Sequence, residues 1–328
     1  MKVRRLTVLI GLIGFAASVC AEAGSPIPAA APPVLTPDVT KLRLASANAL
    51  VFDAQTDQPI YAKGADIVQP IASVTKLMTA MVVLDAGQSL DEPVVIGIDD
   101  FDLLKGSHSR LRLGSELPRG EMLRLALMAS ENRAASALAR YYPGGMDACV
   151  AAMNRKAIAL GMNNTHFDDP TGLSSGNVST ASDLSRMVRA AAEYDLIRTY
   201  TTTPSYYVEV QPGKLLGYNN TNSLVRAGQW DITVSKTGFI REAGKCLVML
   251  ANIASRPIVI VLLDSYGRLT RIGDANRVKY WLETGKTMPA SKALPRSTTT
   301  KRVSGTIVPT SSKSRASAKT ATSVKART

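Results

Sequence analysis

Three short groups of polar residues, each in apolar surroundings, have the composition of a nucleophilic active site. In chain order they are Ser73-Val-Thr-Lys76, Ser130-Glu-Asn132 and Lys236-Thr237-Gly238. A serine hydroxyl becomes a good nucleophile when a neighbouring base removes its proton. A neutral lysine amine can be that base, because burial among apolar side chains lowers the pKa of a lysine. The three groups in this order therefore predict a serine nucleophile that is activated by a lysine.

The first group is predicted to begin a helix. Pro70 is a natural break ahead of it, and Gly87 can end the helix as a C-cap. Ser73 and Lys76 would lie on the same helical face, one turn apart. The surrounding residues are mostly Ile, Val, Leu, Met and Ala, so little water is left for an ammonium group. The alternative is a serine that caps the helix and a lysine that points to solvent.

The other two groups also have ordinary explanations when taken singly. Ser130 could be a hydroxyl at a helix end, and Lys236 could end a strand. Metal and triad chemistry are disfavoured, since His108 and His166 are the only histidines and no H-E-x-x-H, zinc-spaced cluster or G-x-S-x-G motif is present. Each histidine is interpreted as a loop residue, and no metal or cofactor is expected.

Strand and helix patterns are segregated along the chain. Strands are expected in 47–64, around a turn at Asp57-Gln58, and again in 205–212, 230–238, 245–253 and 257–265. Helices are expected after Ser73, in 119–142, in 146–162 and in 274–283. This order predicts the α+β class, an antiparallel sheet with helices packed on it, and not a βαβ repeat.

The two ends of the chain differ in composition from the middle. Residues 1–23 have the basic start, apolar stretch and small-residue cleavage pattern of a signal peptide. Residues 24–44 are expected to be a flexible Pro/Ala-rich segment, 45–285 a catalytic domain and 286–328 a disordered tail. The tail carries ten Lys and Arg and no acidic residue, so most of the net charge of +13 lies there. No nucleic-acid partner is expected.

Two cysteines remain after the predicted cleavage, Cys149 and Cys246. They could pair in an oxidising compartment, or they could be two buried free thiols. The sequence leaves both alternatives open.

With its three motifs, the chain resembles the penicillin-recognising serine DD-peptidases. It is similar to the low-molecular-weight D-alanyl-D-alanine carboxypeptidase/endopeptidase family, peptidase family S11, and within it to the penicillin-binding protein 7-type endopeptidases. The segments that carry the resemblance include QPIASVTKLMTAMVVLDA, LALMASENRAASALARYYPGG, LGMNNTHFDDPTGLSSGNVSTASDL and SKTGFIREAGKCLVML, and it covers residues 45–285. It implies a β-lactamase/DD-peptidase-like fold, in which the active site lies between the sheet and an all-helical lobe.

The resemblance also implies a role for each motif residue. Ser73 would be the nucleophile and Lys76 its base, while Ser130 would relay a proton and Asn132 would position Lys76 and the substrate. Lys236 would supply positive potential on the opposite wall, Thr237 would bind the leaving group's carboxylate, and Gly238 would let the substrate approach the strand. The backbone N–H groups of Ser73 and Phe239 would form the oxyanion hole.

The expected function is hydrolysis of peptidoglycan peptides in the periplasm by an exported protein, with β-lactams as covalent inhibitors. Cleavage of D-Ala–diaminopimelate cross-links is favoured over trimming of pentapeptide stems. A non-catalytic protein that binds the cell wall or a polyanion is the alternative from another class. A β-lactamase is disfavoured because no E-x-x-L-N string is present. The basic tail is a candidate for binding an anionic wall or membrane surface.

Overall fold

The computed structural model describes residues 37–102, 105–211 and 213–289, and the described residues up to Met288 belong to one compact unit. The predicted signal peptide, most of the predicted flexible segment and nearly all of the basic tail lie outside them. Within these ranges, no helix is both long and apolar enough to cross a lipid bilayer.

A five-stranded sheet is the centre of the fold, with the strand order β2-β1-β11-β10-β9 and antiparallel pairing throughout. Its strands are β1 (Asn48–Asp53), β2 (Gln58–Lys63), β9 (Asp231–Ile240), β10 (Gly244–Ile253) and β11 (Arg256–Ser265). The predicted antiparallel sheet and its α+β class are therefore confirmed. Strand β9, which carries Lys236, Thr237 and Gly238, is an outer strand of this sheet.

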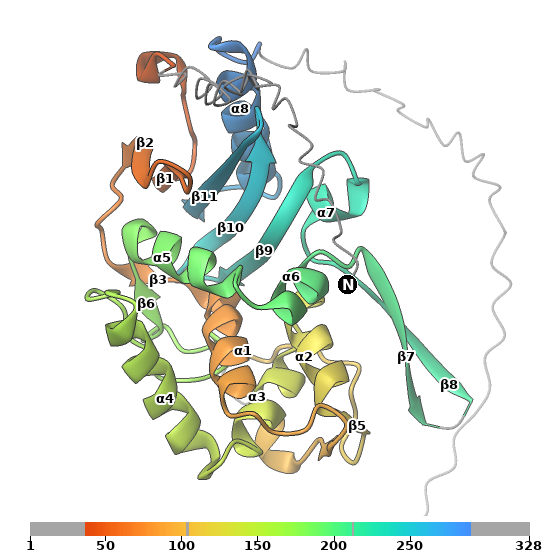
Figure 1. The fold of residues 1–328 in the computed structure, drawn as a ribbon. Helices are drawn as coiled ribbons and strands as arrows, with labels where there is room; N and C mark the ends of the chain where they lie inside the picture. The colour runs from red at the N-terminus through yellow and green to blue at the C-terminus, as the bar shows by residue number, and fades with distance from the viewer. Residues whose placement is uncertain (1–36, 103–104, 212, 290–328) are drawn as a thin grey trace, which may run out of the picture. The chain divides into compact units, whose positions relative to one another are not determined.

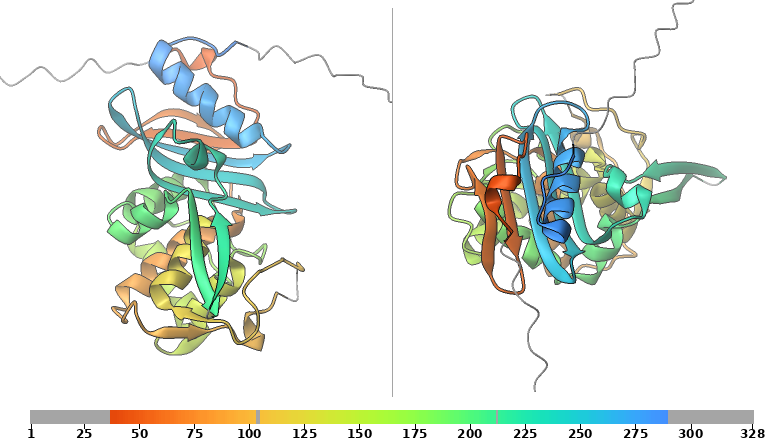
Figure 2. Two further views of the ribbon diagram at one scale, coloured as in Figure 1. Left: turned by 90° about the vertical axis from the view of Figure 1, so that its right-hand side faces the viewer. Right: turned by 90° about the horizontal axis from the view of Figure 1, so that it is seen from above.

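Helices cover both faces of the sheet (Figures 1 and 2). Helix α8 (Thr270–Thr284) packs on one face and helix α5 (Ala181–Ala191) on the other. Along β10, Leu247 and Met249 belong to the core beneath α8, while Val248 belongs to the core on the opposite side. Successive side chains of a strand point to opposite faces. A strand covered on both faces is therefore apolar at nearly every position, as β10 and β11 are.

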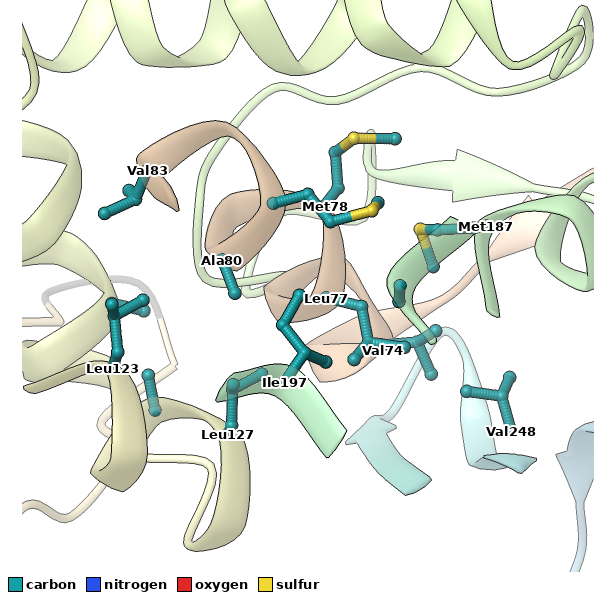
Figure 3. Close-up of a cluster of buried hydrophobic side chains, with 14 of the residues drawn as sticks. Val74, Leu77, Met78, Ala80, Val83, Leu123, Leu127, Met187, Ile197 and Val248 are labelled. Carbon is teal, nitrogen blue, oxygen red and sulfur yellow. The ribbon is translucent and has the colours of Figure 1, made fainter. Parts of the chain in front are cut away.

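The larger core joins the sheet to a lobe of helices. Its helices are α1 (Lys76–Asp85), α2 (Arg119–Met128), α3 (Asn132–Arg140), α4 (Gly145–Ala159) and α6 (Asp195–Thr201). Helix α1 lies in the middle of this core, where Leu77 and Met78 are surrounded by side chains of other helices and of β10 (Figure 3). Burial on all sides fixes the position of α1, and with it the position of the residues just before it.

Short elements complete the described structure. They are η1 (Val39–Lys41), η2 (Ala72–Thr75), η3 (Ile98–Asp100), α7 (Ser223–Ala227) and the strand pairs β3 (Gln69–Pro70) with β6 (Val178–Ser179), β4 (Pro93–Val95) with β5 (Glu116–Pro118), and β7 (Ser205–Gln211) with β8 (Lys214–Asn219). The β7–β8 hairpin extends away from the body of the fold in Figure 1.

The structure differs from the sequence-based expectations in the middle of one helix and at the start of the folded unit. The helix expected over 119–142 is two helices, α2 and α3, because the backbone reverses at Ser130, where φ is 60°. The folded unit also begins before residue 45. Leu42 and Leu44 are buried in the core beneath α8, and the indole N–H of Trp281 donates a hydrogen bond of 3.0 Å to the carbonyl of Asp38.

Cys149 and Cys246 are both free, and both are fully buried. Burial raises the pKa of Cys149 to about 12 and that of Cys246 to about 11. Both side chains are therefore protonated thiols inside the core at neutral pH.

Candidate active site

The three polar groups of the sequence meet at one cavity of about 770 Å³. Its wall includes Ser73, Ser130, Asn132, Thr237, Gly238 and Phe239. Lys76 and Lys236 lie behind this wall, each only 1% exposed. The helical lobe supplies the first two groups and the edge strand β9 supplies the third, so all the candidate residues are brought together.

Ser73 lies in η2, directly before α1. The helix expected to begin at Ser73 therefore starts with a 3₁₀ turn. Ala72 has φ of 49°, an uncommon conformation for a residue with a side chain. Its carbonyl accepts a hydrogen bond of 2.8 Å from the Thr75 hydroxyl, which in turn accepts one of 3.0 Å from the Asn177 amide. These buried contacts hold the backbone that carries Ser73.

Lys76 is the partner of Ser73. Its Nζ lies 2.9 Å from Ser73 Oγ, 2.7 Å from Asn132 Oδ1 and 2.6 Å from the carbonyl oxygen of Thr171. The amide and carbonyl oxygens can only accept hydrogen bonds, so they take both N–H groups of a neutral amine. The lone pair of that amine then points to the remaining partner, the Ser73 hydroxyl. This arrangement is suited to removing a proton from Ser73.

The electrostatics of the site favour this protonation state. Burial lowers the pKa of Lys76 to about 7, and the opposing effect of Asp169 and Glu131 is smaller. A lysine with a lowered pKa has its neutral form accessible near neutral pH, which is the condition for a base that works there.

Ser130 and Lys236 form the opposite wall. Ser130 lies in the loop between α2 and α3, and its left-handed backbone conformation turns the side chain into the cavity. Lys236 Nζ donates hydrogen bonds of 2.9 Å to Ser130 Oγ and 3.0 Å to the carbonyl of Thr237. Burial lowers the pKa of Lys236, and the positive charges of Lys76 and Arg271 lower it further. A carboxylate that entered the cavity would raise this pKa again, because an opposite charge favours the ammonium form.

Gly238 allows β9 to approach Ser73 closely. A Cβ atom at this position would lie 2.8 Å from the carbonyl oxygen of Ile71 and 3.3 Å from the backbone nitrogen of Ser73. Only glycine fits without displacing one of these backbones. Phe239 follows on the cavity wall with a side chain that is 56% exposed. The pairing of the Ser73 and Phe239 N–H groups as an oxyanion hole stays a prediction.

A loop that supports Lys76 was not predicted from the sequence. Asp169 accepts hydrogen bonds from the backbone N–H groups of Thr171, Gly172 and Ser174, and Thr171 in turn presents its carbonyl to Lys76. The sequence signal for this loop was the string Asp169-Pro-Thr-Gly172, which is typical of a turn. This pattern does not indicate that the turn lies against Ser73.

Gly172 packs against the backbone of Ala72 and Ser73 more tightly than Gly238 does. Its φ is +80°, and a Cβ would lie 2.0 Å from the carbonyl oxygen of Ala72 and 2.8 Å from the nitrogen of Ser73. We expect Gly172→Ala to lower the free energy of unfolding by about 2–4 kcal/mol, from overpacking and left-handed backbone strain together. Because the clash displaces Ser73, acylation by penicillin should also slow by an order of magnitude or more.

Gly161→Ala is the matched control. Gly161 has φ of +70°, but the nearest atom to its added Cβ is a side-chain carbon of Arg186 at 4.0 Å. This variant should show only the backbone strain, about 1–2 kcal/mol, and unchanged acylation. Thermal unfolding and acylation rates measure both effects. Equal acylation by the two variants would show that the contact with Ala72 is not needed to position Ser73.

Thr221 and Arg271 were also not predicted to belong to the site, since each is far in sequence from the motif that it supports. Thr237 Oγ1 lies 2.7 Å from Thr221 Oγ1. Arg271 of α8 donates hydrogen bonds to the carbonyl oxygens of Gly238, at 2.9 Å, and Cys246, at 3.2 Å. Both residues line the cavity. The described residues hold no group of three or more His, Cys, Asp or Glu side chains placed to bind a metal ion.

Comparison with known proteins gives consistent matches. The family model Peptidase S11, D-alanyl-D-alanine carboxypeptidase, matches residues 35–267. A D-alanyl-D-alanine endopeptidase of Pseudomonas aeruginosa is 47% identical over 283 residues, which are 86% of this chain and 89% of that protein. One of Escherichia coli is 49% identical over 251 residues, 76% of this chain and 81% of its own length. The crystal structure of the Streptomyces K15 DD-transpeptidase superposes with a TM-score of 0.69 at 29% identity, covering 74% of this chain and 98% of that one.

Proposed function

The chain belongs to the D-alanyl-D-alanine carboxypeptidase family, peptidase family S11, and we propose that it is a DD-endopeptidase that hydrolyses D-Ala–diaminopimelate cross-links in peptidoglycan. The observation that carries the proposal is the buried Lys76 amine in hydrogen-bond contact with Ser73 Oγ, in a cavity lined by all three motifs. The endopeptidase names of the relatives from Pseudomonas and Escherichia support the choice of bond.

In the acylation step, Ser73 Oγ attacks the carbonyl carbon of the D-Ala residue while Lys76 Nζ takes its proton. The backbone N–H groups of Ser73 and Phe239 would hold the oxyanion, and each such donor contributes about 3–4 kcal/mol in other hydrolases. Collapse of the tetrahedral intermediate breaks the amide bond. The leaving amine receives a proton through Ser130, which Lys236 contacts, and the acyl group stays on Ser73 until water releases it.

Recognition of the leaving group requires cations near its carboxylate. Thr237 and Arg271 line the cavity where β9 meets α8, and Lys236 lies behind the wall beside Thr237. We assign the carboxylate next to the scissile amide to these side chains, because a charge-assisted hydrogen bond is stronger than a neutral one. The free edge of β9 would bind the peptide backbone as an added strand.

Carboxypeptidase activity would use the same catalytic residues, since both leaving groups carry a carboxylate beside the amide. The endopeptidase must also admit the rest of a second stem. We expect D-Ala–diaminopimelate cross-links to be cut at least about ten times faster than pentapeptide termini are trimmed, a difference of about 1.4 kcal/mol in transition-state binding. Incubation of purified protein with cross-linked dimers and monomeric pentapeptides, with products identified by mass, measures both rates.

Equal rates on the two substrates would leave only the broader DD-peptidase assignment. Ser73→Ala protein is the control for both reactions, because it keeps the cavity and lacks the nucleophile.

We also infer that the protein acts in the periplasm and that its basic tail adds affinity for anionic wall or membrane surfaces. The amino-terminal export pattern and the ten basic residues from Lys286 onward support this. Sedimentation of chains with and without residues 286–328 with purified cell walls at low and high salt measures the contribution of the tail.

A further inference from the structure

An ion pair lies on the wall of the active-site cavity. Lys105 Nζ lies 2.5 Å from Glu242 Oε1, and the two side chains are 33% and 41% exposed. Lys105 belongs to the loop between η3 and β5, and Glu242 to the turn between β9 and β10. Both residues line the same cavity as Ser73. Opposite charges from two walls of the substrate cavity therefore face each other.

The position of Glu242 along the chain places the pair relative to the scissile bond. In the proposed function Thr237 binds the leaving group, and Phe239 lies beside the carbonyl that Ser73 attacks. Glu242 lies beyond Phe239 in the same direction along the chain, two residues after β9 ends and in the turn that leads to β10. The pair therefore lies on the acyl side of the scissile bond, where the residue before the D-Ala must bind.

In the proposed substrate that residue is diaminopimelate, which has two amino-acid centres. One is in the backbone of the stem. The other ends the side chain, and when it is not cross-linked it is a zwitterion with one ammonium and one carboxylate. This second centre lies up to about 10 Å from the D-Ala carbonyl carbon, given a Cα–Cα step of about 3.8 Å and a few C–C bonds.

We infer that Lys105 and Glu242 form a subsite for this zwitterion, in which Lys105 binds its carboxylate and Glu242 its ammonium group. The inference rests on the proposed function and adds a determinant of substrate choice to it. Lys105 lowers the pKa of Glu242, so Glu242 is a carboxylate that can accept hydrogen bonds from an ammonium group. An exposed ion pair contributes little to stability, so it opens readily.

The paired charges determine which ligands are preferred. A zwitterion gives each of the two side chains a new partner when their own contact opens. A ligand with a single charge leaves one side chain unpaired, and such a mismatch disfavours the wrong partner. A neutral side chain gains nothing from either residue.

The test uses three cross-linked dimers that differ only in the donor diaminopimelate. One has the free zwitterion, one has its amine acetylated and one has its carboxylate amidated. In the wild-type protein either modification should lower kcat/KM by about fivefold. Glu242→Gln should remove the sensitivity to acetylation and keep the sensitivity to amidation, while Lys105→Met should do the reverse. A merely structural role of the pair would not produce this crossed pattern.

Two controls distinguish an effect on substrate choice from a general loss of activity. Acylation by a penicillin without a charged side chain should be unchanged in both variants. The pair Lys156–Asp85, at 2.7 Å and with side chains 22% and 44% exposed, lies outside the cavity wall, so its double alanine variant should keep the wild-type preferences. Equal cleavage of all three dimers by wild-type protein, or the same pattern in both single variants, would overturn the inference. Protein that reacts with penicillin and cuts none of the dimers would instead contradict the proposed function.

Discussion

Covalent labelling by a fluorescent penicillin is expected to disappear in the Ser73→Ala variant, while the fold is retained. Ser73 Oγ is the hydroxyl that Lys76 contacts at 2.9 Å, and alanine removes the atom that would carry the acyl group. The small side chain fits the same 3₁₀ turn, so the thermal unfolding midpoint should stay close to that of the wild type. Fluorescence of the denatured protein band on a gel measures the labelling.

Ser107→Ala is the matched control, because Ser107 places another serine on the wall of the same cavity. Its labelling should equal that of the wild type. Labelled and folded Ser73→Ala protein would show that a different residue is the nucleophile, and the catalytic assignment would then have to be rebuilt around that residue.

The second large effect concerns the base. Lys76→Arg should lower the rate of acylation by at least about a thousandfold, since a guanidinium stays protonated at every accessible pH and cannot take the Ser73 proton. The larger planar group must also fit among Ser73, Asn132 and Thr171, which are spaced for a single nitrogen atom. Stopped-flow measurement of acylation by a chromogenic β-lactam follows the rate.

The pH dependence separates loss of the base from misplacement of the serine. In the wild type the active form is the neutral amine, and the pKa of Lys76 is about 7. The acylation rate should therefore rise about tenfold per pH unit below 7 and level off above it. The arginine variant should show no such rise at higher pH. Wild-type acylation that is flat between pH 5 and 9, or fast acylation by Lys76→Arg, would exclude Lys76 as the base.

The sequence was sufficient to predict the antiparallel sheet and the contact between Ser73 and Lys76, because both follow from patterns in the chain. Strands β10 and β11 contain long apolar runs separated by a short turn, and such runs pair with their neighbours along the chain. Ser73 and Lys76 are one turn apart, so their contact follows from helix geometry. The meeting of Ser130 with Lys236 required the resemblance to a known family, since the two are 106 residues apart.

Features that depend on tertiary contacts could not be predicted from local patterns. The break at Ser130 is one example: the residues on both sides of it favour helix, and only the packed structure supports a left-handed conformation there. The role of Thr171 is another, because its backbone carbonyl binds Lys76 and a carbonyl has no signature in the sequence. Arg271 approaches β9 from α8, which follows it by two further strands. Strand β8 was missed for a local reason, because Gly217 weakens its β pattern.

The two buried cysteines can be used to detect local unfolding of the protein. A protonated thiol inside a packed core is reached by neither an oxidant nor an alkylating reagent while the surrounding elements stay in place. Cys149 lies in a helix of the lobe and Cys246 in the second strand of the sheet, counted from the catalytic edge. Mass spectrometry after a timed pulse of alkylating reagent therefore distinguishes opening of the helical lobe from opening of the sheet, with no residue changed. A single modified thiol would mark partial opening, and simultaneous modification of both would mark cooperative unfolding of the whole catalytic unit.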